Sequence, residues 1–121
     1  MSSPRLDLAI KIQAWRLREL LKWREYLKAL VEAAVEVFGE DVEVYVFGSV
    51  VEGGLTADSD IDVAIVLRDV PRRGLDRAWL LDSLWKAMES RGVPWWYPFE
   101  IHLVTREELA LLKDAKLVRV H

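Results

Sequence analysis

Apolar and polar residues recur with two different periods along the chain, and these periods predict its elements. From Arg5 to Phe38 the apolar residues have helical spacing without a single Gly or Pro, and Gly39 follows as a candidate C-terminal cap. We therefore expect an N-terminal helix over residues 1–38, about 50 Å long if it is unbroken. Such a helix either bends without a sequence breaker or projects beyond the core of a domain of this size.

Three later segments show the two-residue alternation of β-strands. They are residues 41–47, 60–67 and 99–104, and the second becomes continuously apolar, which is typical of a central strand. Helical spacing returns over residues 75–91. A capping box at Thr105–Glu108 predicts a last short helix that ends near Lys113. Residues 115–121 are either an edge strand or a frayed end.

Helices interleaved with strands predict one α/β (α+β) domain over residues 1–121, with a mixed sheet of about three to five strands flanked by helices. Within it we expect the N-terminal helix, a core over residues 42–104, and a C-terminal helix and tail over residues 105–121. The chain has 121 residues and is 52% hydrophobic, which is enough for one core and too apolar for a disordered chain.

Charge and composition exclude several classes of function. Lys and Arg number 17 against 20 Asp and Glu, so the net charge is −3 and nucleic-acid binding by bulk electrostatics is not expected. The absence of Cys excludes disulfides and thiolate metal sites. No uncharged stretch approaches the length of a membrane span, and the N-terminus lacks the pattern of a signal peptide. We expect a cytoplasmic protein that does not contact membranes.

Two carboxylates at the start of the second predicted strand are the first candidate for chemistry. Asp60 and Asp62 are two residues apart, so their side chains share one face of a strand. Adjacent carboxylates repel each other, and Mg²⁺ compensates them well because it prefers hard oxygen ligands. The alternative is that Asp60 belongs to a turn and Asp62 simply faces water.

The ends of the neighbouring predicted strands carry further candidates. Gly48 and Ser49 form a turn whose backbone N–H groups and hydroxyl suit phosphate oxygens, although such a pair alone is an ordinary hairpin turn. Glu100 could complete a cluster of three carboxylates that holds two Mg²⁺ ions about 4 Å apart. Glu100 or His102 could instead deprotonate an attacking hydroxyl, or both could face solvent.

Phe47-Gly48-Ser49, ten intervening residues and Asp60-Ile61-Asp62 resemble the G-S-x10-D-x-D signature of the DNA polymerase β-like nucleotidyltransferase superfamily. Within it, the chain is most similar to the minimal nucleotidyltransferases, over about residues 42–104. The resemblance implies the nucleotidyltransferase fold and transfer of a nucleoside monophosphate, AMP from ATP in the first place, to a hydroxyl with release of pyrophosphate. It implies that Asp60 and Asp62 hold Mg²⁺ and that Gly48 and Ser49 bind the triphosphate. Glu100 stands where the superfamily usually has Asp.

The chain is too short for a separate acceptor domain, so we expect a partner to present the acceptor. The resemblance implies a helical, toxin-like partner protein, and a homo-oligomer is a further alternative. A rival hypothesis is an inactive, antitoxin-like protein that neutralises a helical partner by binding it. Trp15, Trp23 and Tyr26 either contact such a partner or cover the sheet of their own chain. Trp95 and Trp96 either stack on a base, pack loops onto the core or lie at a contact.

Overall fold

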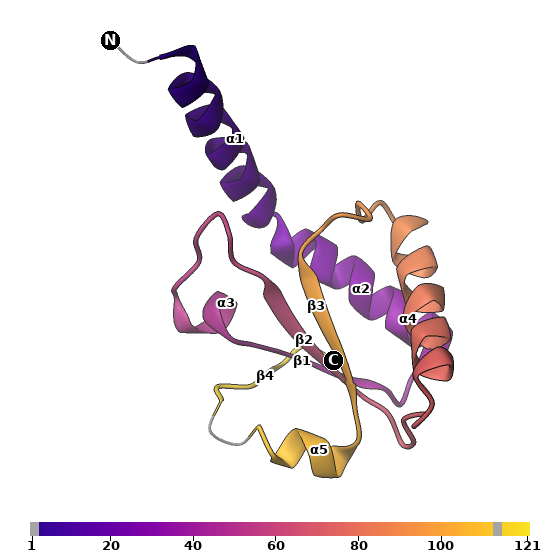
Figure 1. The fold of residues 1–121 in the computed structure, drawn as a ribbon. Coiled ribbons are helices and arrows are strands. Elements are labelled where there is room, and N and C mark those ends of the chain that lie inside the picture. The colour runs from indigo at the N-terminus through magenta and orange to yellow at the C-terminus, as the bar shows by residue number, and fades with distance from the viewer. Residues whose placement is uncertain (1–2, 113–114) are drawn as a thin grey trace.

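A mixed sheet with strand order β3-β2-β1-β4 carries the fold (Figure 1). The structure, a computed structural model, describes residues 3–112 and 115–121. Strands β1 and β2 pair antiparallel, β2 and β3 pair parallel, and β4 pairs antiparallel with the free edge of β1. The predicted fold class, a mixed sheet flanked by helices, is therefore confirmed. The strands are β1 (Glu43–Phe47), β2 (Ile61–Val66), β3 (Phe99–Val104) and β4 (Val118–Arg119).

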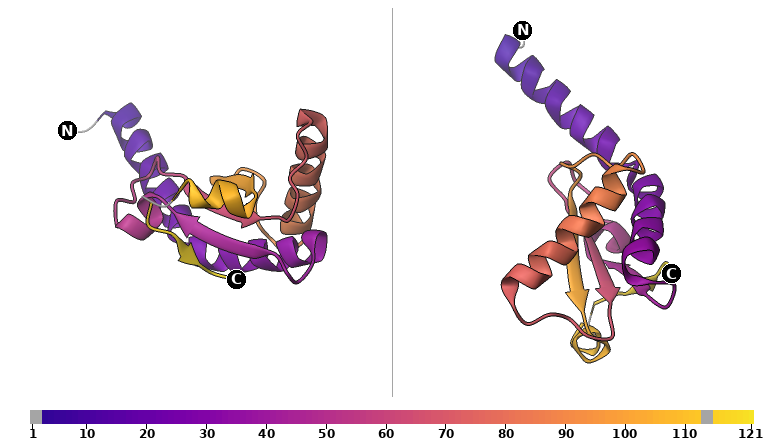
Figure 2. Two further views of the ribbon diagram at one scale, coloured as in Figure 1. Left: turned by 90° about the horizontal axis from the view of Figure 1, so that it is seen from below. Right: turned by 90° about the vertical axis from the view of Figure 1, so that its right-hand side faces the viewer.

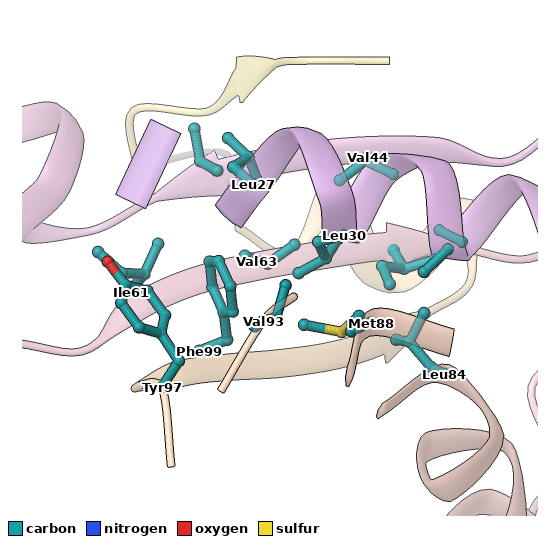
Figure 3. Close-up of a cluster of buried hydrophobic side chains, with 14 of the residues drawn as sticks. Leu27, Leu30, Val44, Ile61, Val63, Leu84, Met88, Val93, Tyr97 and Phe99 are labelled. Atoms are coloured by element: carbon teal, nitrogen blue, oxygen red, sulfur yellow. The ribbon is translucent and has the colours of Figure 1, made fainter. Parts of the chain in front are cut away.

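The main core lies between one face of the sheet and a layer formed by two helices, α2 (Trp23–Phe38) and α4 (Gly74–Glu89). Alternate residues of each strand point into this core, so Ile61, Val63 and Ile65 are all fully buried. Side chains from both helices meet these strands, as Figure 3 shows for Leu30 of α2 and Met88 of α4. Three fully buried residues make β2 the centre of the domain.

The opposite face of the sheet is covered over only part of its length. Helix α5 (Arg106–Ala110) packs Leu109 against Ala64 and Val66 of β2 in a smaller apolar cluster. This helix begins with the predicted capping box, in which the Thr105 and Glu108 side chains each bond to the other's backbone N–H. Asp62 shares this second face with Ala64 and Val66, because side chains two residues apart on a strand point the same way.

The N-terminal segment is helical as predicted, but it consists of two helices and not of one unbroken helix over residues 1–38. Helix α1 (Pro4–Leu20) and helix α2 are separated by a turn at residues 21–22. The Tyr97 hydroxyl donates to the carbonyl oxygens of Glu19 (2.9 Å) and Leu20 (3.1 Å). These carbonyls would otherwise accept the next bonds of a continuous helix. A tertiary contact thus interrupts the helix, and α1 projects from the body of the domain (Figures 1 and 2).

The remaining elements agree with the predicted pattern at most boundaries. A single helical turn, α3 (Ser49–Glu52), follows β1 inside the predicted loop. The tail adopts the edge-strand alternative as β4. The expected end of the last helix at Lys113 lies outside the described residues. Among the described helices, none combines the length and the apolar character that a membrane crossing requires.

Candidate functional site

Three chemically active side chains converge on the partly open face of the sheet. The parallel register pairs Asp62 of β2 with Glu100 of β3, and His102 lies two residues further along β3 on the same face. His102 Nε2 lies 3.7 Å from Asp62 Oδ1 and 3.8 Å from Glu100 Oε1. One potential ligand atom from each residue lies within 4.8 Å of the other two. The arrangement is therefore compact enough for one cation to contact all three.

The Nε2 atom of His102 is a polar atom that the surrounding protein leaves unsatisfied. It is buried, and no hydrogen-bond partner for it exists in the part of the chain that the structure describes. The imidazole ring packs against Phe47 of β1, with 5.5 Å between ring centroids. A buried polar atom without a partner costs about 1–3 kcal/mol, so its retention beside two carboxylates points to a cation in the site.

The donor set of the site fits a divalent metal ion. Asp62 and Glu100 supply hard carboxylate oxygens of the kind that Mg²⁺ and Mn²⁺ bind. His102 adds an imidazole nitrogen, which suits transition metals better than it suits Mg²⁺. The three residues therefore fit a divalent cation without selecting one metal.

Gly48 borders the carboxylate of Asp62 so closely that only glycine fits there. Phe47 pairs with Asp62 across β1 and β2, and Gly48 follows directly with a φ of 79°. A Cβ atom at Gly48 would overlap Asp62 Oδ2 far inside contact distance. The sequence predicts that Gly48 and Ser49 form a turn suited to phosphate oxygens. The structure shows that Gly48 also makes room for the central carboxylate, and Ser49 begins α3 at the same turn.

Asp60 lies apart from the group formed by Asp62, Glu100 and His102. Strand β2 begins at Ile61, so Asp60 belongs to the preceding loop, and its side chain is exposed. It lines a cavity together with Trp15 and Trp96. Two of the three predicted carboxylates therefore meet on the sheet, and the metal-binding role of Asp60 stays a prediction.

From the sequence, His102 is a candidate base or a solvent-facing residue, and its place in a group of potential ligands was not predicted. The available signal was its two-residue spacing from Glu100, which places both side chains on one face of a strand. This spacing indicates a shared site with Asp62 only when β3 is known to pair in parallel with β2.

Comparison with known proteins identifies the class of the domain. Residues 16–118 match the model of the nucleotidyltransferase domain family. The chain belongs to this family. A proposed nucleotidyltransferase from Sulfolobus solfataricus has a similar structure, with a TM-score of 0.57, 24% sequence identity and 84% of each chain covered. A comparison with curated proteins finds no match.

Family membership confirms that the chain is a nucleotidyltransferase domain and supports nucleotidyl transfer as its class of reaction. The similar structure has the same fold over most of its length. In this nucleotidyltransferase domain the matched region includes the Gly48-Ser49 turn, both aspartates and Glu100. The predicted superfamily and fold are thus confirmed together.

Proposed function

We propose that this nucleotidyltransferase domain transfers a nucleoside monophosphate, AMP from ATP, to a hydroxyl acceptor with release of pyrophosphate. The observation that supports the proposal best is the convergence of Asp62, Glu100 and His102 beside the Gly48-Ser49 turn. Acidic residues grouped around a divalent cation are typical of sites for in-line phosphoryl displacement.

Each residue has a distinct role in the proposal. Asp62 and Glu100 hold Mg²⁺, with Asp60 as a further ligand, and the turn at Gly48 and Ser49 binds the β- and γ-phosphates. When bound, Mg²⁺ supplies positive charge that stabilises the α-phosphate in the transition state and lowers the pKa of the attacking hydroxyl.

The proposed chemistry makes one bond and breaks one. The acceptor oxygen bonds to the α-phosphorus, and the bond from that phosphorus to the oxygen shared with the β-phosphate breaks, so that pyrophosphate leaves with this oxygen. The hydroxyl proton moves to His102. His102 lies where it can accept a proton from a group bound at Asp62, because its ligand atom is within 4.8 Å of that carboxylate.

In this proposal a partner protein presents the acceptor hydroxyl. The partner is helical and toxin-like, and its modification by AMP silences it. Helix α1 is a suitable docking element because it projects from the domain and exposes apolar residues. Four of these on its first turns are Leu6, Leu8, Ile10 and Ile12.

The experiment follows the label from ATP to the candidate partner in the presence of Mg²⁺. Nucleotidyl transfer carries the label of [α-³²P]ATP to the partner and leaves the label of [γ-³²P]ATP in pyrophosphate. Transfer of the γ-label, or no transfer although calorimetry shows that ATP binds, would contradict the proposal. The Asp62→Asn variant serves as the inactive control.

A second candidate function is binding without catalysis, in which α1 neutralises a helical partner by complex formation. The exposed apolar side chains of α1 favour it, because exposed apolar side chains on a projecting helix are suited to contact with a partner. The two candidates differ in their response to Asp62→Asn. Neutralisation by binding survives this change, whereas neutralisation by modification is lost.

A further inference from the structure

Two tryptophans near the candidate site, Trp15 and Trp96, line a cavity of about 460 Å³. Three segments enclose it: the second half of α1, the loop that enters β2, and the loop that enters β3 (Figure 1). Its volume lies within the range of small-molecule sites. The apolar part of its lining consists of Trp15, Leu20, Ala57, Trp96 and Pro98.

Two tryptophans form a wall of this cavity. The rings of Trp15 and Trp96 lie 5.2 Å apart between centroids and are tilted by 46°. Both side chains remain accessible, with 44% and 40% of the residue surface exposed. Aromatic faces that are held in place and still reach solvent are suited to stacking on a flat ring.

The wall is held rigidly by the residue next to Trp96. Tyr97 is buried, and its hydroxyl donates to the carbonyl oxygens of Glu19 and Leu20 at the end of α1. These bonds fix the loop that carries Trp96 to the helix that carries Trp15. A ligand therefore meets a preformed aromatic surface and loses little free energy to ordering it.

Two residues that line the cavity are near neighbours in the chain of the candidate active-site residues. Asp60 lines it, and about 7 Å of extended chain separates this residue from Asp62. Pro98 lines it as well, two residues before Glu100. The amide of Ile61 donates to the Pro98 carbonyl oxygen at 2.8 Å, which ties the two entering loops together. A molecule that reacts at Asp62 and Glu100 can therefore extend into the cavity.

The charges around the cavity decide which part of a nucleotide it accepts. Three carboxylates, those of Glu19, Asp58 and Asp60, line it together with one guanidinium, Arg16. Arg16 already pairs with Asp58 at 3.4 Å, and Lys22 pairs with Glu19 at 3.0 Å, which leaves the charge of Asp60. The remaining negative charge repels a polyphosphate, whereas an uncharged ring that stacks on tryptophan is accepted.

We propose that this cavity binds the base of the nucleotide substrate, stacked against Trp15 and Trp96. The inference rests on the proposed function, because it takes the nucleotide as the ligand. It assigns Trp15 and Trp96 to substrate binding and identifies α1 as part of the nucleotide site.

The test uses calorimetry to measure how tightly the protein binds the whole nucleotide and each of its parts. Adenosine carries the base without phosphates, and inorganic triphosphate with Mg²⁺ carries the phosphates without the base. Wild-type protein should bind MgATP more tightly than triphosphate and should bind adenosine. Trp15→Leu and Trp96→Leu keep an apolar side chain and remove the aromatic face. Each should weaken MgATP binding about tenfold and leave triphosphate binding unchanged.

Trp95→Leu is the matched control, because Trp95 neighbours Trp96, is 75% exposed and does not line the cavity. It should bind MgATP as the wild type does. Circular dichroism checks that each variant is folded. In the wild type, adenosine should also shift the indole N–H resonances of Trp15 and Trp96 and not that of Trp95, a readout that needs no variant.

The outcomes separate this inference from the proposed function. Equal affinities of wild-type protein for MgATP and triphosphate, or unchanged MgATP affinity in both leucine variants, would overturn the base assignment alone. Unchanged nucleotide affinity together with a raised KM for the acceptor would assign the cavity to the acceptor and also overturn it. Adenosine binding without triphosphate binding would support the cavity assignment and contradict nucleotidyl transfer.

Discussion

Gly48 lies against the carboxylate of Asp62, and any larger residue at position 48 would collide with Asp62 Oδ2. The glycine also has a φ of 79° and a ψ of −154°, a region of backbone conformation that is almost restricted to glycine. Position 48 therefore requires glycine for two reasons. The backbone conformation there is rare for other residues, and a larger side chain would collide with the carboxylate of Asp62.

Gly48→Ala should disturb both the backbone and Asp62. The backbone strain should lower the free energy of unfolding by about 1–3 kcal/mol. Displacement of the Asp62 carboxylate should in addition abolish the rise in thermal midpoint on addition of Mn²⁺. Urea unfolding and thermal scans with and without Mn²⁺ measure the two effects.

Gly39→Ala is the matched control for this variant. Gly39 has a similar backbone conformation, with φ 99° and ψ 166°, and none of the residues that the structure describes has an atom within 4 Å of an added Cβ atom. It should lose a similar amount of stability and keep the response to Mn²⁺. If both variants respond to Mn²⁺ like the wild type, the contact with Asp62 has no role in holding the metal.

Asp62→Asn should remove metal binding because it removes the carboxylate at the centre of the group. In the wild type, Mn²⁺ at about 100 times its Kd should add about 2.7 kcal/mol to the free energy of unfolding. Mn²⁺ should add little to the free energy of unfolding of the variant. The rate of nucleotidyl transfer should fall by about a hundredfold or more, because mutation of a residue that only supports a metal ligand already lowers metal affinity or activity about 10- to 100-fold. Asp69→Asn, an exposed carboxylate in the loop after β2, is the control. Equal stabilisation of wild type and Asp62→Asn would exclude Asp62 as a ligand.

Local sequence patterns predicted the helices and strands of this fold. Contacts between distant segments determine the features that these patterns did not predict. Alternation predicted all of β3, and the Thr105–Glu108 capping box was visible in the sequence because it involves near neighbours. The interruption between α1 and α2 was not predictable locally. It depends on a hydroxyl, that of Tyr97, from a segment far along the chain.

The candidate site was also predictable only in part from the sequence. Spacing placed Asp62 beside the Gly48 turn, and the structure bears out that proximity. The inclusion of His102 depends on the parallel register between β2 and β3, which no local pattern specifies. Asp60 lies in the loop that precedes β2 and is not among the residues whose ligand atoms meet at the site.

Tyr97→Phe should destabilise the domain and change its response to alkaline pH. Removal of the hydroxyl bonded to the carbonyls of Glu19 and Leu20 should cost about 1–2 kcal/mol near neutral pH. Burial raises the pKa of the Tyr97 hydroxyl above its ordinary value of 10.0. Above that pH the unfolded chain releases this proton while the folded chain keeps it, so the contribution of the hydroxyl to stability declines.

The measurement compares the free energies of unfolding of wild type and Tyr97→Phe at about pH 8 and at about pH 11. The difference between the two proteins should be smaller at the higher pH, because only the wild type carries the group in question. Other groups that titrate in this range are common to both proteins and cancel. A difference that stays constant or grows would show that this hydroxyl does not stay protonated in the folded domain.

The exposed apolar side chains on the first turns of α1 should contribute little to the stability of the isolated domain. Leu6 and Ile10 lie one turn apart and are 52% and 56% exposed. The double change Leu6→Gln and Ile10→Gln should therefore alter the free energy of unfolding by less than about 0.5 kcal/mol. Leu20→Ala at the buried end of the same helix should cost about 2–5 kcal/mol.

Light scattering on the same samples shows whether a second copy of the chain or a separate partner protein covers Leu6 and Ile10. If a second copy of the chain covers them, the wild type has a higher mass than the glutamine variant, and its stability depends on protein concentration. If a separate partner covers them, both proteins are monomeric and only the variant fails to bind the partner. A large loss of stability in a monomeric glutamine variant would contradict both, because it would mean that Leu6 and Ile10 pack against their own domain.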